Sequence, residues 1–360
     1  MFSFLKKNRG PFTAKILPLG KSITVKSGSS ENLLKAALEN GIQWPYNCRV
    51  GSCGTCRCKL IGGKIKPLND FSYVLSGEEL DAGYILACQT MLKSDIEVEV
   101  QLDSEANGVE LAKTRTLKGK IIDAKLLTHD ILEVRVELEG DFKDYLPGQY
   151  ADILVPGVVD RARSYSFSRS PANEKSNQVS FFIRKVKSGE FTEWLHAGSR
   201  VGQQIVLDGP HGNFYLRKPE GPLVLIAGGS GLAPIRALMQ QITAERVQAP
   251  VTLIFGARTQ QDLYCLKEIE EFASQMNGRF KFIPVLSMEK NGNGWHGAVG
   301  NSPDAITPEM IDAKTSHAYL CGPPLMIDAA IDRLKNMGLD EKRIYFDKFL
   351  DASTMPAGRG

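Results

Sequence analysis

The spacing of apolar residues changes twice along the chain and divides it into three regions. In the first region, residues 12–103, short alternating stretches at 13–17 and 21–25 predict a β-hairpin. The stretch 33–38 carries apolar residues at helical spacing, and the alternating stretch 96–100 predicts a closing strand. This order of strands and one helix predicts a small α+β sheet.

The second region is dominated by short, β-rich stretches that turn residues separate at regular intervals. Such spacing is typical of an antiparallel barrel. The predicted strands are residues 118–125, 131–138, 150–154, 179–186 and 204–207.

The third region alternates buried strands with amphipathic helices, which predicts a doubly wound parallel sheet. The predicted strands are residues 223–227, 251–255, 280–286 and 317–320, and the predicted helices are residues 234–247, 266–276 and 325–337. Together the three patterns predict a multidomain protein of α+β and α/β classes. We expect a domain at 1–103, a linker at 104–114, domains at 115–217 and 218–350, and a tail at 351–360.

Composition excludes several classes of function. The 360 residues carry a net charge of +3, and no basic stripe interleaved with aromatics predicts nucleic-acid binding. The longest apolar run, residues 223–239, is broken by glycines, a proline and an arginine, so we expect no membrane span. The first seven residues lack the apolar core of a signal peptide. We therefore expect a cytoplasmic protein, acting as a monomer.

Four of the seven cysteines form a recognisable pattern. Cys48, Cys53 and Cys56 have the spacing C-x4-C-x2-C, and Cys88 follows at a distance, which is the plant-type spacing for a [2Fe–2S] cluster. Glycines between the cysteines allow the loop to curl around a small cluster. Structural zinc is an alternative, but zinc sites usually carry two paired knuckles, and disulfides are uncommon in a reducing compartment. Cys58 is interpreted as a small core residue.

A second group of residues suits a flavin. An arginine at 163 can neutralise a pyrophosphate, Tyr165 can lie against the isoalloxazine, and neighbouring serines can bond its polar edge. A short helix predicted after Gly189 offers free N–H groups to a phosphate. The predicted flavin-binding residues are Arg163, Ser164, Tyr165, Ser166, Arg184, Gly189, Thr192, Gly209 and Gly212.

A third group suits a nicotinamide nucleotide. A glycine-rich turn connects the first parallel strand to its helix, although it is not G-x-G-x-x-G, and a second loop follows a late strand of the same sheet. Cys321 in that loop is placed beside the nicotinamide, or is a buried structural thiol, and Arg258 could take a 2′-phosphate. The predicted residues are Gly228, Gly229, Ser230, Gly231, Arg258, Cys321, Gly322 and Pro323.

These three groups, in this order, resemble the single-chain NADH-dependent reductases of bacterial multicomponent oxygenases. The likeness extends from about Phe12 to Phe349, and the stretches 50–56, 163–168, 255–258 and 262–266 resemble the subgroup that serves monooxygenases of alkyl-aromatic hydrocarbons. That family fuses a β-grasp plant-type ferredoxin to an FAD-binding barrel and an NAD-binding α/β domain. The resemblance implies that Phe349 shields the flavin, and that Tyr165, Ser166, Cys321 and Phe349 act at the point of hydride transfer.

The resemblance implies a function in which NADH reduces FAD, and electrons pass through the cluster to a terminal hydroxylase. The partner implied is a membrane-embedded di-iron enzyme. Two alternatives stay open: the same chain of cofactors serving a deoxysugar dehydratase, and a cluster-bearing carrier without NADH turnover. The basic residues Arg49, Arg57 and Lys59 near the cluster loop further suggest a positive rim that meets an acidic acceptor.

Overall fold

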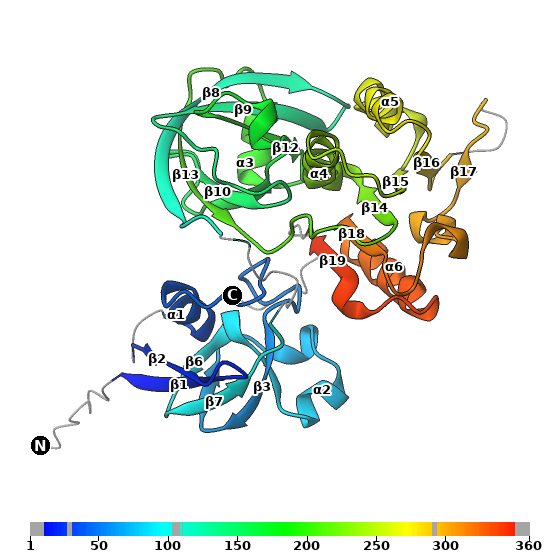
Figure 1. Ribbon diagram of the computed structural model, residues 1–360. Helices are drawn as coiled ribbons and strands as arrows, with labels where there is room; N and C mark the ends of the chain where they lie inside the picture. The colour runs from blue at the N-terminus through cyan, green and yellow to red at the C-terminus, as the bar shows by residue number, and fades with distance from the viewer. Residues whose placement is uncertain (1–10, 27–30, 103–108, 110, 290–293, 350–360) are drawn as a thin grey trace, which may run out of the picture. The chain divides into compact units, whose positions relative to one another are not determined.

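A computed structural model describes residues 11–26, 31–102, 109, 111–289 and 294–349 (Figure 1). Contacts divide the chain into two units, Met1–Asn107 and Gly108–Gly360, which are described separately. Part of the predicted linker at 104–114 and the predicted tail at 351–360 lie outside the described residues. No helix in the described parts of the chain is both long and apolar enough to cross a bilayer.

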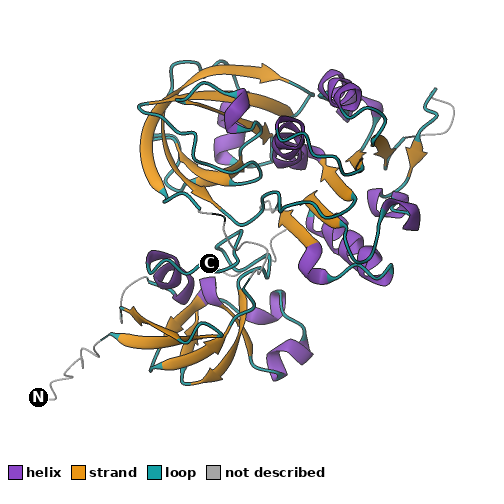
Figure 2. Cartoon of the chain, in the orientation of Figure 1, coloured by secondary structure: helices purple, strands orange, loops and turns teal. Residues whose placement is uncertain are grey.

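The first unit is a five-stranded mixed sheet in the order β2-β1-β7-β3-β5, packed against a helix (Figure 2). Strands β1 and β2 form the predicted antiparallel hairpin, and β1 pairs in parallel with β7. The apolar face of α1 buries Leu33 and Leu34 against a core that includes Trp44. The elements are β1 (Phe12–Leu17), β2 (Lys21–Val25), α1 (Leu33–Glu39), β3 (Arg57–Gly62), β4 (Ile65–Pro67), α2 (Gly77–Asp81), β5 (Tyr84–Leu86), β6 (Thr90–Leu92) and β7 (Ile96–Glu99).

The second unit begins with a six-stranded antiparallel sheet in the order β11-β10-β13-β8-β9-β12. A bridge between Phe167 and Phe181 joins its two outer edges, so the sheet nearly closes into the predicted barrel. Alternating residues of every strand fill its interior. The elements are β8 (Arg115–Leu126), β9 (Ile131–Leu138), β10 (Tyr150–Leu154), β11 (Arg163–Ser166), β12 (Gln178–Arg184), α3 (Glu190–His196) and β13 (Gln204–His211).

The rest of the second unit is a parallel sheet in the order β17-β16-β15-β14-β18-β19. Alternate residues of β14 face two different cores: Leu225 packs with α4 and α5, whereas Ile226 packs with α6. Helices on both faces confirm the predicted doubly wound class. The elements are β14 (Leu223–Gly228), α4 (Leu232–Ala244), β15 (Val251–Ala257), α5 (Leu266–Gln275), β16 (Phe280–Leu286), β17 (Ala298–Val299), β18 (His317–Gly322), α6 (Pro324–Asn336) and β19 (Ile344–Lys348).

Helix α4 differs from its predicted range, 234–247, at both ends. The turn Gly229–Gly231 leads directly into the helix, which therefore begins two residues before Pro234. Pro234 is tolerated in the first turn because an N–H at that position has no partner in the helix. The helix ends early because Arg246 takes a left-handed conformation, φ 51°, and the next N–H, of Val247, bonds back to Ile242.

Candidate functional site: a cluster loop and a nucleotide cleft

The cluster loop brings all four predicted cysteines together in the first unit. Cys53, Cys56 and Cys88 are buried, and Cys48 is half-buried. The N–H of Ser52 lies 3.4 Å from Cys48 Sγ, that of Val50 also bonds Cys48, and that of Gly51 bonds Cys88. Backbone donors aimed at sulfur are the surroundings that a cluster with anionic thiolates requires.

The four sulfurs are arranged as two pairs. The Cys53 thiol donates toward Cys48 and lowers the pKa of Cys48 to about 5, against the effect of burial. The Cys56 thiol likewise donates toward Cys88 and lowers the pKa of Cys88, while the pKa of Cys56 is raised.

This pairing separates an iron–sulfur site from a zinc site. A tetrahedral zinc ion with Zn–S bonds of about 2.3 Å holds all four sulfurs about 3.8 Å apart. Groups of three or more potential ligands within 4.8 Å of one another do occur among the described residues, but none includes these cysteines. Two separated pairs fit a cluster with two metal atoms, so the residues present fit a [2Fe–2S] group.

Gln89, which follows Cys88 in the chain, stabilises the cluster loop through its side-chain amide. Its Nε2 donates to the Arg49 carbonyl at 3.3 Å and to Cys88 Sγ at 3.8 Å. A Cβ at Gly51, where φ is +77°, would overlap the Gln89 side chain. The motif therefore needs glycine for a close approach as well as for backbone conformation. Sequence reasoning missed Gln89, because only the folded loop brings its amide to a ligand sulfur.

The predicted flavin-binding residues 163–166 form β11, at the edge of the barrel sheet. The Arg163 guanidinium donates to the carbonyls of Arg161 and Ala162, and Ser164 donates to Asp152 at 2.6 Å. Tyr165 packs against Phe191 of α3, with ring centroids 5.6 Å apart. Burial raises the pKa of Tyr165, so its hydroxyl is neutral.

The other predicted flavin residues lie around that strand. The Ser166 hydroxyl lies 3.4 Å from Asp347 Oδ2 on β19, which joins the barrel to the parallel-sheet domain. The Thr192 hydroxyl accepts the Val186 N–H at 3.1 Å, and Gly189 precedes the first residue of α3. Three predicted flavin residues remain. Gly209 in β13 packs against β10, and the carbonyl of Gly212, in the turn after β13, accepts a bond from Gln149. Arg184, at the end of β12, instead lines the nucleotide cleft described next.

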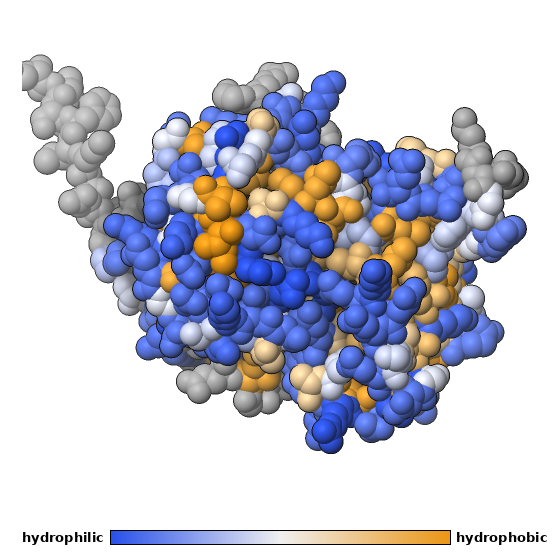
Figure 3. Space-filling view, turned by 90° about the horizontal axis from the view of Figure 1, so that it is seen from above, coloured by the Kyte–Doolittle hydropathy of each residue, from blue (hydrophilic) through white to orange (hydrophobic). Residues whose placement is uncertain are grey.

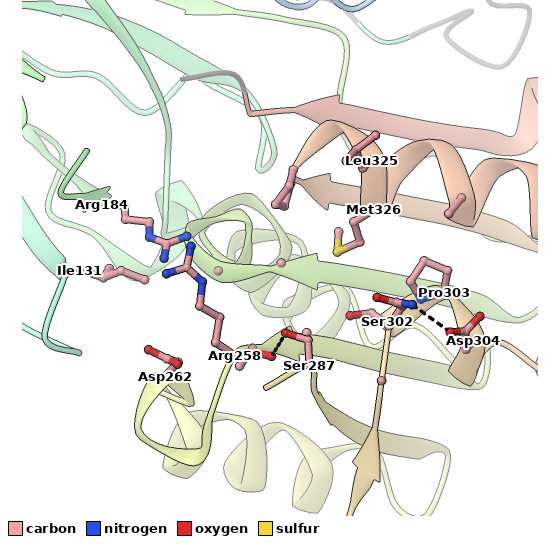
Figure 4. Close-up of a pocket in the computed structure, with 18 of the residues that line it drawn as sticks. Ile131, Arg184, Arg258, Asp262, Ser287, Ser302, Pro303, Asp304, Leu325 and Met326 are labelled. Atoms are coloured by element: carbon pink, nitrogen blue, oxygen red, sulfur yellow. Dashed lines mark hydrogen bonds between the residues drawn. The ribbon is translucent and has the colours of Figure 1, made fainter. Parts of the chain in front are cut away.

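The predicted nucleotide loops line a cleft of about 520 Å³ in the second unit (Figure 4). Gly228 and Gly229 come from the end of β14, and Pro323 comes from the loop after β18. The other described lining residues are Asp130, Ile131, Arg184, Gly256, Ala257, Arg258, Asp262, Ser287, Gly300, Asn301, Ser302, Pro303, Asp304, Leu325, Met326 and Ala329.

Two glycines of the loop after β14 are required because this loop packs closely against the loop after β18. A Cβ at Gly228 would lie 2.7 Å from Met326 Sδ and 2.9 Å from Pro323 Cδ, and one at Gly231 would overlap the Cys321 carbonyl oxygen. The two loops therefore meet at the carboxyl ends of β14 and β18, where ligands bind in such sheets. An open cleft beside two bare glycine backbones fits a nicotinamide nucleotide.

Charged residues at this cleft come from both domains of the second unit. Arg184 Nε lies 2.7 Å from Asp130 Oδ2, and this guanidinium holds the pKa of Asp130 below its usual range although burial opposes the shift. Arg184 and Arg258 point toward the same part of the cleft in Figure 4. Asp262 lies 3.4 Å from His129 of the β8–β9 turn. Sequence patterns did not indicate Asp130, because it lies in no recognisable motif, and they gave Asp262 only as part of the stretch 262–266 that carries the family likeness, with no role at the cleft.

None of the four predicted catalytic residues lines this cleft: Tyr165 and Ser166 are on β11, and Cys321 and Phe349 pack in the core of the parallel-sheet domain. Cys321 is fully buried in the core beneath α4, and burial raises its pKa, so it is a neutral thiol. Phe349 directly follows β19, donates its N–H to the Gly322 carbonyl at 2.8 Å and packs half-buried against the same core. The structure thus brings Phe349 beside the second nucleotide loop.

The surface seen in Figure 3 is mostly hydrophilic, with apolar residues in small, separate patches. Two exposed apolar side chains belong to the sites themselves. Val50 in the cluster loop is 50% exposed, and Leu325 at the mouth of the cleft is 85% exposed. Singly exposed apolar residues are normal on a protein surface and do not by themselves mark a binding site.

Comparisons with known proteins identify each part of the chain. Residues 16–93 match the 2Fe-2S iron-sulfur cluster binding domain, residues 118–215 the oxidoreductase FAD-binding domain, and residues 225–332 the oxidoreductase NAD-binding domain. The xylene/toluene monooxygenase electron transfer component of Pseudomonas putida is 38% identical over 353 residues, which cover 97% of this chain and 98% of that protein.

Other relatives share the same organisation. The reductase component of the naphthalene 1,2-dioxygenase system of Pseudomonas putida is 33% identical, over 93% of this chain and 97% of that protein. The crystal structure of the Amycolatopsis cytochrome P450 reductase is 30% identical, with a TM-score of 0.77 over 94% of this chain and 98% of that one. The chain is therefore an FAD-, NAD- and [2Fe–2S]-dependent oxidoreductase, and it belongs to the family of ferredoxin-fused reductase components of bacterial oxygenase systems.

Proposed function

We propose that this protein supplies electrons from NADH to the terminal hydroxylase of a hydrocarbon monooxygenase whose substrates are alkyl-aromatic compounds. The observation that carries the proposal is the 38% identity, over nearly the whole of both chains, with an electron transfer component of a xylene/toluene monooxygenase. When bound, FAD takes a hydride from NADH and passes electrons singly to the cluster.

In this proposal each site residue has a stated role. Cys48, Cys53, Cys56 and Cys88 ligate the cluster, in the two pairs described above. On the barrel, Arg163 neutralises the FAD pyrophosphate and Tyr165 lies against the ring system. The remaining proposed flavin contacts are Ser164, Ser166, Gly189, Thr192, Gly209 and Gly212, and Phe349 covers the flavin face. We further propose that the domains extend over residues 1–103, 115–217 and 218–350.

We propose that NADH occupies the cleft of the second unit. Gly228, Gly229, Ser230 and Gly231, together with the loop from Cys321 to Pro323, hold the pyrophosphate and nicotinamide, and Arg184 and Arg258 add positive charge. Among the described residues that line the cleft, three carboxylates, those of Asp130, Asp262 and Asp304, outnumber two guanidinium groups. Such a lining opposes a further 2′-phosphate and supports NADH over NADPH.

The acceptor that we propose is a membrane-embedded di-iron hydroxylase, and the reductase itself acts as a monomer. The cluster loop presents Val50 and basic residues to this partner. Arg57 pairs with Glu79 at 3.4 Å, which reduces the positive charge near the loop. A charge-reversing Arg49→Glu variant, assayed across a salt series, tests whether the remaining charge guides the acceptor.

Reconstitution tests the function directly. The purified protein, loaded with FAD and cluster, is mixed with NADH and membranes containing a xylene or toluene monooxygenase hydroxylase that lacks its own reductase. We expect NADH oxidation coupled to formation of the benzylic alcohol, and a higher kcat/KM for NADH than for NADPH. Reduction of cytochrome c without any hydroxylation would assign the chain to a different acceptor, and no NADH oxidation at all would make it a carrier.

A further inference from the structure

Arg236 on α4 is a buried charge at the boundary between the barrel and the parallel-sheet domain. Arg236 is 4% exposed. Its guanidinium lies beside two carboxylates, which come from different elements. Nη1 lies 2.9 Å from Glu133 Oε1 on β9 of the barrel. On the other side, Nε lies 2.5 Å from Glu268 Oε2 on α5, within its own domain. A buried guanidinium requires such partners, so the pairing fixes the helix against the barrel.

The barrel side of this contact is itself held in place. Arg169 shares the same Glu133 oxygen at 2.9 Å, and both guanidinium groups keep the pKa of Glu133 below its usual range although burial opposes the shift. One turn further along α4, the Gln240 side chain accepts the Ser170 N–H at 2.8 Å. One face of α4 therefore makes two polar contacts with the barrel.

An aromatic stack connects this contact to the nucleotide loop. The Arg236 guanidinium carbon lies 5.0 Å from the centroid of the Phe182 ring on β12. Phe182 in turn packs edge-on against Tyr264, with centroids 5.4 Å apart. The buried Tyr264 hydroxyl donates to the Gly229 carbonyl at 2.9 Å, directly within the glycine loop. Arg236, Phe182 and Tyr264 thus form a continuous path from the barrel wall to the loop.

The position of this loop decides where the nicotinamide can lie. Arg236 follows Gly231 by five residues of continuous helix, a rise of about 7.5 Å along a rigid rod. Hydride transfer requires reacting atoms about 3–3.5 Å apart, and a displacement of about 1 Å can cost about 100-fold in rate. A small rotation of α4 against the barrel would therefore lower the rate of hydride transfer before it changed other properties of the protein.

We propose that Arg236 is a positioning residue for hydride transfer: by binding Glu133 across the domain boundary, it holds the nucleotide loop at the correct distance from the flavin barrel. The inference depends on the proposed function, in which the barrel holds FAD and the cleft holds NADH. Glu268 provides the matched control. It binds the same guanidinium from within the parallel-sheet domain, and its side chain is 43% exposed.

The test measures flavin reduction in the holoprotein by stopped flow, with NADH and with NADH deuterated at the transferred position. We expect Arg236→Met and Glu133→Gln to slow flavin reduction at saturating NADH by about tenfold or more, with a larger isotope effect. The dissociation constant for NADH should change less than the rate. Arg236→Lys should recover part of the rate, and Glu268→Gln should stay within about twofold of wild type.

The experiment distinguishes a positioning role of Arg236 from a purely structural role, and it distinguishes both from a failure of the proposed function. Arg236→Met leaves Glu133 paired with Arg169, so the variant should keep its flavin and fold. Wild-type rates and isotope effects in folded Arg236→Met and Glu133→Gln would overturn the proposal, as would rate loss that tracks flavin loss alone. If Arg236→Met does not fold, Tyr264→Phe, which removes a single hydroxyl, decides by the same measurement. If NADH fails to reduce the wild-type flavin, the proposed function fails instead.

Discussion

The cluster loop and the nucleotide cleft are built in opposite ways. Three of the four proposed cluster ligands lie within nine residues, and backbone N–H groups of the same loop surround their sulfurs. The cleft instead gathers residues from two domains of the second unit, from Asp130 on the barrel to Met326 on α6. A site built locally depends on single ligands, whereas a site built from distant segments depends on how closely those segments pack.

The largest expected effect comes from removing a cluster ligand. Cys53→Ser should abolish electron delivery to cytochrome c and to the hydroxylase, while NADH still reduces the flavin, because the cleft shares no residue with the loop. Absorbance and electron paramagnetic resonance of the reduced protein measure the cluster. Cys58→Ala is the control, since that thiol is 1% exposed in the core and lies two residues beyond the motif. A cluster signal retained in Cys53→Ser would contradict the assignment.

A close-packed glycine should be the weak point of the cleft. In Gly231→Ala the new methyl group meets the Cys321 carbonyl oxygen, a backbone atom that cannot move alone. We expect a loss of about 1–3 kcal/mol in stability of the reductase unit, together with slower flavin reduction and an intact cluster signal. Thermal unfolding and stopped-flow absorbance are the measurements. Gly198→Ala, with no atom within 4 Å of the added Cβ, should behave as wild type.

A smaller effect is expected from Gln89, whose side-chain amide reaches the sulfur of a cluster cysteine. Gln89→Leu removes a donor to Cys88 Sγ, and donors favour the more negative reduced cluster. The midpoint potential should fall by about 30–60 mV, a three- to tenfold change in a one-electron equilibrium. A redox titration followed by electron paramagnetic resonance measures it, with the exposed Gln101→Leu as control. An unchanged potential would show that backbone donors alone determine the tuning.

The smallest effect concerns the choice of nucleotide. Asp262→Asn removes one of the carboxylates of the cleft, which is also the partner of His129. Because the group is partly exposed, we expect only about a two- to fivefold gain in kcat/KM for NADPH relative to NADH. Steady-state kinetics with both nucleotides provide the measurement. A change confined to NADH would indicate that Asp262 contacts the part that the two nucleotides share.

The sequence alone was enough to predict what depends on local spacing. The cysteine spacing predicted a [2Fe–2S] domain, and the change from strand repeats to strand–helix alternation predicted a barrel followed by a parallel sheet; the matched domain families confirm all three. Short elements such as β4, β6 and β19 were not predicted, because three to five residues carry too little periodic signal.

Tertiary structure alone decided which distant residues meet. The sequence could not place Gln89 on a ligand sulfur, Asp130 beside Arg184, or Glu133 against Arg236, because these contacts depend on how strands and domains pack. Tertiary structure also buried Cys321 in the core, which is one of the two positions that the sequence left open for this thiol. Spacing along the chain determines which groups are available, and packing determines which of them face one another.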